Sequence, residues 1–132
     1  MSRRAGQPQP EVAVVDRQRA ARISPVRVGA FVEYALERLR LPGAQVTVVL
    51  VGERAMRALN GRWRGKDRPT DVLSFSQREG EGGGLHPDLL GDVVVSVPTA
   101  VRQAGAAGLP LAEEETYGSL RSTIVGCFRF VL

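Results

Sequence analysis

Residues 60–75 read Asn-Gly-Arg-Trp-Arg-Gly-Lys-Asp-Arg-Pro-Thr-Asp-Val-Leu-Ser-Phe, and the interpretation of the whole chain depends on this stretch. Four cations and one tryptophan fall between Arg62 and Thr70, and an apolar run from Val72 to Phe75 follows directly. That density of positive charge is not typical of a protein core, but it is typical of a surface that binds a polyanion. Composition alone is equally consistent with a solvated loop between a helix and a strand.

The length of 132 residues predicts a single domain. Hydrophobic residues make up 43% of the chain but aromatic residues only 5%, so the core must rest on Val, Leu and Ala. The sequence contains neither an apolar run of membrane-spanning length nor a signal-peptide pattern, which predicts a cytoplasmic protein with no membrane partner. The single cysteine, Cys127, agrees with a reducing compartment.

The net charge of +4 is unevenly distributed along the chain. Residues 1–70 carry 14 Lys and Arg against 6 Asp and Glu, a net +8, whereas residues 71–132 carry 4 against 8, a net −4. A basic first half is compatible with nucleic-acid binding. Arginine-rich solvated faces are an equally good explanation of the same numbers.

The first half of the chain predicts strands and helices in alternation. Val-rich residues 11–15 form a short strand, and Ser24-Pro25 begins a helix of about four turns that Pro42-Gly43 ends. The apolar run Gln45–Val51 suits a central strand with both faces covered. A short helix with Met56 and Leu59 on its inner face follows and is expected to end near Asn60-Gly61.

The second half completes a mixed sheet. Strands are expected at residues 72–75 and 89–97, with a glycine-rich loop between them, and helices are expected to begin at Pro98 and Leu111. Residues 123–131 favour a strand over a helix, because they are β-branched and aromatic. The order β-α-β-α-β-β-α-α predicts an α+β fold in which helices pack on a mixed sheet of about four strands.

Two motifs carry a resemblance to a known family: the run from Trp63 to Phe75, and Leu90-Gly-Asp-Val93 downstream. Together they resemble the YbeY family of rRNA-maturation endoribonucleases over roughly residues 11–115, and the combination is specific. The resemblance implies a zincin-like metallohydrolase architecture. It also implies hydrolysis of single-stranded RNA in small-subunit rRNA maturation and ribosome quality control, with RNA and a ribosomal protein as partners.

The resemblance assigns roles to the residues of the opening stretch. Arg64 takes the place of the family's active-site arginine, and its guanidinium suits a bidentate grip on a phosphate. Arg62, Lys66 and Arg68 are expected to contact RNA phosphates. Trp63 is either a core anchor or a stacking platform, and the lone tryptophan of an aromatic-poor chain favours the core.

The metal site of the family is missing from this sequence. The resemblance implies zinc held by three histidines, spaced H-x-x-x-H-x-x-x-x-x-H, near the C-terminus, with water in the fourth position. Residues 116–132 contain no histidine, His86 is interpreted as a solvated loop residue, and Cys127 as a small buried hydrophobe. No metal ligand is therefore assigned.

Three segments follow from these patterns: a disordered lead-in at 1–10, a YbeY-like domain at 11–115, and an aberrant tail at 116–132 with an incomplete metal site. A frameshift or a truncated gene would produce such a tail, which is expected to be poorly ordered. The chain is then an endoribonuclease relative without activity. The alternatives are a metal-free module that binds rRNA or the ribosome, and a non-functional product.

Overall fold

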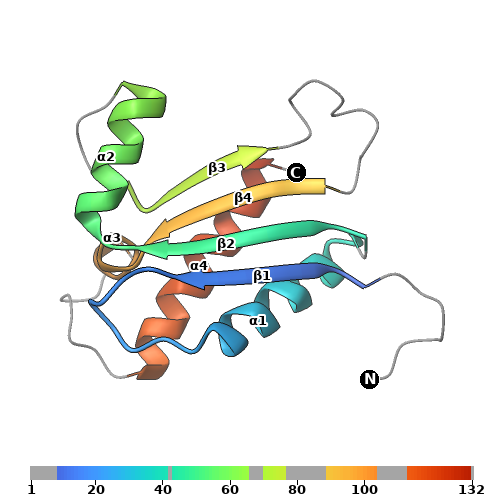
Figure 1. Ribbon diagram of the computed structural model, residues 1–132. Helices are drawn as coiled ribbons and strands as arrows, with labels where there is room; N and C mark the ends of the chain where they lie inside the picture. The colour runs from blue at the N-terminus through green and yellow to red at the C-terminus, as the bar shows by residue number, and fades with distance from the viewer. Residues whose placement is uncertain (1–8, 42, 66–69, 77–88, 104–112, 132) are drawn as a thin grey trace.

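A computed structural model of the chain describes residues 9–41, 43–65, 70–76, 89–103 and 113–131 (Figure 1). The order of its elements is the one expected from the sequence. In chain order they are β1 (Glu11–Asp16), α1 (Pro25–Arg38), β2 (Gln45–Val51), α2 (Glu53–Arg64), β3 (Val72–Ser76), β4 (Leu89–Ser96), α3 (Val97–Gln103) and α4 (Glu113–Val131).

The four strands form one mixed sheet in the order β1-β2-β4-β3. β1, β2 and β4 are parallel, whereas β3 pairs with β4 in the antiparallel direction and forms an edge. β2 therefore lies inside the sheet, as its nearly continuous apolar sequence predicts. The expected α+β class with a mixed four-stranded sheet is confirmed.

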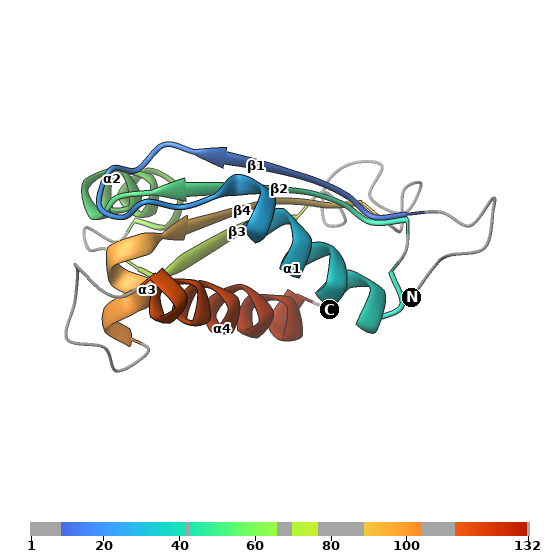
Figure 2. The same ribbon diagram turned by 90° about the horizontal axis from the view of Figure 1, so that it is seen from below.

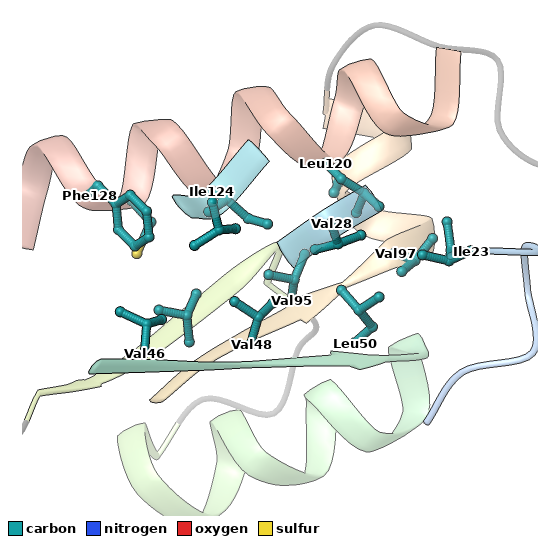
Figure 3. Close-up of a cluster of buried hydrophobic side chains, with 14 of the residues drawn as sticks. Ile23, Val28, Val46, Val48, Leu50, Val95, Val97, Leu120, Ile124 and Phe128 are labelled. Atoms are coloured by element: carbon teal, nitrogen blue, oxygen red, sulfur yellow. The ribbon is translucent and has the colours of Figure 1, made fainter. Parts of the chain in front are cut away.

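One face of the sheet is covered by α1 and α4, which lie together beneath it in Figure 2. Alternate residues of the strands point to this face because successive side chains of a strand point to opposite sides. The resulting core is made mainly of aliphatic side chains (Figure 3). Its fully buried members include Val28, Val32 and Leu36 from α1, Val48, Leu50 and Val95 from the sheet, and Leu120 and Ile124 from α4.

The opposite face carries α2, which lies across the sheet from α4 in Figure 3. Met56 is fully buried there against Val51, Leu73 and Val94, and Leu59 packs at the edge of this smaller cluster. α2 is thus fixed to the sheet independently of the main core.

The start of α1 shows how local sequence signals and tertiary contacts combine. Ser24 caps the helix by accepting a hydrogen bond from the Arg27 N–H at 3.3 Å, and Pro25 occupies the first turn. The backbone N–H of Ser24 itself donates to the hydroxyl of Tyr117 at 2.6 Å. That bond ties the beginning of α1 to α4.

The strand expected at residues 123–131 is wrong, because this segment belongs to the 19-residue helix α4. Tyr117, Leu120, Ile124 and Phe128 recur at intervals of three and four residues and are all buried, so helical packing outweighs β propensity. A side chain at Gly118 or Gly126 would meet nothing within 4 Å, so neither glycine is needed for close packing. α4 covers the sheet, contrary to the expectation of a poorly ordered tail.

Candidate nucleic-acid interface

α2 carries four arginines in twelve residues and extends further than its sequence predicts. The expected end near Asn60-Gly61 is wrong, because the helix continues to Arg64 and ends at Gly65. Gly65 adopts a left-handed conformation (φ 68°) and donates its N–H to the carbonyl oxygen of Gly61 at 3.2 Å. Arg62, Trp63 and Arg64 therefore lie on the last turn of a helix and not in a loop.

The only acidic residue of α2 is neutralised by α3. Glu53 forms an ion pair with Arg102 and accepts a hydrogen bond from the Thr99 hydroxyl at 3.4 Å. Thr99 in turn accepts a hydrogen bond from the hydroxyl of Ser96 at 2.9 Å. This chain of polar contacts fixes the first turn of α2 and removes its carboxylate from competition for the arginines.

The arginines of α2 that the structure describes in full point into solvent. Arg54, Arg57 and Arg62 are exposed, and no carboxylate in the described part of the chain pairs with them. Because Arg54 and Arg57 are three residues apart, they are neighbours on one side of the helix. Exposed guanidinium groups of this kind suit bidentate binding of phosphate oxygens.

Trp63 is not a core residue. Its side chain is 62% exposed, and its ring meets Phe75 of β3 edge-to-face, with centroids 5.9 Å apart and an interplanar angle of 74°. The reason lies in its position: Trp63 falls on the same side of α2 as Met56 but two turns later, where it meets Phe75 of the edge strand β3. The ring is held in place and still accessible, so the expectation of a core residue is wrong.

The structure brings together part of the predicted site. Arg62 is exposed on the last turn of α2, and Arg64 is the final residue of that helix. Lys66 and Arg68 lie outside the described residues. Arg54 and Arg57 were missed by sequence reasoning, although their spacing of three on a predicted helix was a usable signal.

The side chains in the described part of the chain do not fit a zinc ion. No group of three His, Cys, Asp or Glu residues there is arranged to hold a metal, and His86 lies outside that part. Cys127 is buried, as expected, and burial raises the pKa of its thiol, with Asp71 adding to the rise and a hydrogen bond with Ser74 opposing it.

Comparisons with known proteins identify the family of this chain. The family model of the endoribonuclease YbeY matches residues 14–120. "Endoribonuclease YbeY" of Geobacter sulfurreducens is 41% identical over 99 residues, which cover 75% of this chain and 66% of the relative. The protein of the same name from an Anaeromyxobacter species is 48% identical over 85 residues, covering 64% of this chain and 41% of the relative. The solution structure of TM1509 from Thermotoga maritima is similar at a TM-score of 0.42 and 24% identity, over 71% of this chain and 56% of that one.

The fold and the basic helix define an α+β protein with an arginine-rich surface. The family match spans most of the chain and shows that this chain belongs to the YbeY family. It spans about two thirds of the length of the Geobacter relatives that it matches. No helix in the described part combines the length and the hydrophobicity that a membrane span requires.

Proposed function

We propose that this protein binds single-stranded RNA during the maturation of ribosomal RNA in the cytoplasm, and that α2 is the element that grips the RNA. The observation that carries the proposal is the set of unpaired arginines on the exposed side of α2, next to an exposed tryptophan. Phosphate-binding arginines beside an aromatic ring are the usual means of holding single strands without sequence preference.

The proposal divides three tasks among these residues. Arg54, Arg57 and Arg62, together with Lys66 and Arg68, neutralise phosphates along the backbone of the RNA. Trp63 offers the accessible part of its ring to one unstacked base. Arg64 holds the phosphate at which the endoribonucleases of the family cleave, in the bidentate geometry that stabilises developing negative charge.

We further propose that the chain, as given, binds RNA without cleaving it. The family's cleavage depends on zinc, and the side chains described here do not supply a ligand set for it. In this proposal the sequence from about residue 116 departs from the family's histidine-bearing segment, and the nucleotide sequence around codon 116 tests that departure. The small ribosomal subunit and a ribosomal protein are the expected partners.

Fluorescence anisotropy with a labelled single-stranded oligoribonucleotide tests the binding proposal. We compare two variants in which three exposed arginines become glutamine, one on α2 and one on the segment after β1, so that both lose the same charge. The α2 variant changes Arg54, Arg57 and Arg62, and the control changes Arg17, Arg19 and Arg22.

The α2 variant should bind much more weakly, and its plot of log K against log salt should be shallower by about 2, since each phosphate contact on a single strand contributes about 0.7. Equal losses in the two variants would mean that net charge, and not α2, holds the RNA. RNA cleavage that a chelator abolishes would overturn the proposed lack of activity. Neither binding nor cleavage would support the alternative of a non-functional product.

A further inference from the structure

Residues of α1 and α4 line a groove of about 700 Å³. Both helices lie on the face of the sheet opposite to α2 (Figure 2). The walls of the groove are mainly apolar and aromatic, with three arginines among them. Arg27, Phe31, Tyr34 and Arg38 come from α1, Leu39 directly follows this helix, and Tyr117 and Arg121 come from α4.

Each arginine of the groove lies over an aromatic ring. The guanidinium carbon of Arg27 is 3.8 Å from the centre of the Tyr117 ring. Arg121 lies 5.6 Å from the ring of Phe31, and Arg38 lies 5.9 Å from that of Tyr34. Such cation–π contacts, which extend to about 6 Å, favour a position near the ring and leave N–H groups of the guanidinium available to a ligand.

The three arginines differ in their charge balance. Arg27 donates a hydrogen bond to Glu114 at 2.9 Å and lies 3.7 Å from Glu113, and the bond to Glu114 raises its pKa. Within the described residues no carboxylate pairs with Arg38 or Arg121. Among the described residues the groove therefore carries two arginines without a paired carboxylate, and the ligand that complements their charge is an anion.

The apolar part of the groove is open at α1. Tyr34 is 62% exposed and Leu39 is 40% exposed, which places them among the few large hydrophobic side chains that the described part of the chain leaves in solvent. An exposed aromatic ring next to unpaired arginines suits a ligand that is flat and apolar in one part and anionic in another. A nucleotide unit of a single strand has both properties.

We propose that the groove between α1 and α4 is a second contact site for single-stranded RNA, where one unstacked base lies against Tyr34 and its phosphates pair with Arg38 and Arg121. The proposal rests on the proposed function, because it takes RNA as the ligand. The proposal adds a site on the face of the sheet opposite to α2.

The test measures the affinity of a labelled oligouridylate for the full chain by fluorescence anisotropy. Arg38→Gln and Arg121→Gln combined remove the unpaired charges, and Arg19→Gln with Arg22→Gln is the control of equal charge on another exposed segment. We expect a loss of about tenfold or more for the groove variant and a clearly smaller loss for the control. Circular dichroism confirms that both variants remain folded.

A second variant separates base stacking from charge. Tyr34→Ala should lower the affinity for oligouridylate by about tenfold and should leave the affinity for an abasic ribose-phosphate strand unchanged. Unchanged oligouridylate affinity in both groove variants would overturn the proposal. A different result would also overturn it: the wild type binds poly-glutamate, and the Arg38→Gln, Arg121→Gln variant loses this binding but still binds RNA. The groove would then be a docking site for an acidic protein.

The outcome also separates this proposal from the proposed function. Loss of affinity in the groove variant but not in the α2 variant would leave the groove as the RNA site and overturn the role of α2. Loss of affinity in the α2 variant but not in the groove variant would leave α2 as the RNA site and overturn the role of the groove. A chain that binds no RNA contradicts both.

Discussion

Replacing Phe128 by alanine should destabilise the protein by about 3–5 kcal/mol, the range measured for buried Phe→Ala changes. The Phe128 side chain is 1% exposed and packs in the main core, on the same face of α4 as Ile124 (Figure 3). Its removal leaves a cavity between α4 and the sheet that the surrounding side chains fill only in part. With an unfolding entropy of about 2.1 cal/mol/K per residue, the change lowers the melting temperature of 132 residues by about 11–18 °C.

Urea denaturation followed by circular dichroism measures this change directly. Ser122→Ala is the matched control, because Ser122 is exposed on the same helix and its loss should alter the free energy of unfolding by about 0.5 kcal/mol or less. The slope of the free energy with urea should be equal in both variants. If Phe128→Ala shifts the midpoint no more than Ser122→Ala does, the end of α4 is not packed, and the sequence-based expectation of a poorly ordered tail is right after all.

Three further measurements test other parts of the structure. Because Trp63 is the only tryptophan and is 62% exposed, its native fluorescence should be quenched by iodide nearly as strongly as in urea, whereas a protected, blue-shifted emission would place it in a core. Tyr117→Phe removes the acceptor of the Ser24 N–H and should lower the free energy of unfolding by about 1–3 kcal/mol in the same urea assay, and an unchanged value would show that this bond adds nothing. Burial raises the pKa of Cys127, so the native state keeps the thiol proton to higher pH than the unfolded state does. The contribution of this thiol to the free energy of unfolding is therefore complete below about pH 8.5 and is lost as the pH rises. Urea midpoints between pH 7 and pH 10 should therefore fall more steeply for the wild type than for Cys127→Ala, and parallel curves would contradict the shift.

The elements that the sequence predicts well are those with local signals. The bounds of β2 agree with the apolar run from Gln45 to Val51, and α1 begins where Ser24 and Pro25 place it. Strand order does not follow from any single segment, although the helix α1 between β1 and β2 is consistent with their parallel pairing.

The elements that the sequence mispredicts depend on contacts far along the chain. Residues 123–131 have β propensity, yet Ile124 and Phe128 are buried only if the segment is helical and lies across the sheet. At the end of α2, Asn60-Gly61 is a typical stop signal, but the left-handed conformation that ends the helix is adopted by Gly65. Trp63 was assigned to the core on composition, because the sequence does not show how far α2 reaches along the sheet.

The candidate site was predicted in part for the same reason. The charge of Arg62 and Arg64 is visible in the sequence, but the pairing of Glu53 with Arg102, which leaves the α2 arginines without a carboxylate, joins residues 49 positions apart. The groove between α1 and α4 was not predicted at all. Its arginines lie on two helices that only the tertiary structure brings together, so no spacing rule could connect Arg38 with Arg121.

The contacts that hold α2 in place do not depend on the C-terminal helix α4. α2 is held by Met56 and Leu59 against the sheet and by Glu53 against α3, and none of these contacts involves α4. α4 packs on the other face, where its sequence determines the main core and the groove. A chain whose sequence changes from about residue 116 can therefore keep the arginine surface of α2 intact while it loses the family's metal ligands. In the proposal, RNA binding at α2 therefore does not depend on the metal ligands that cleavage requires.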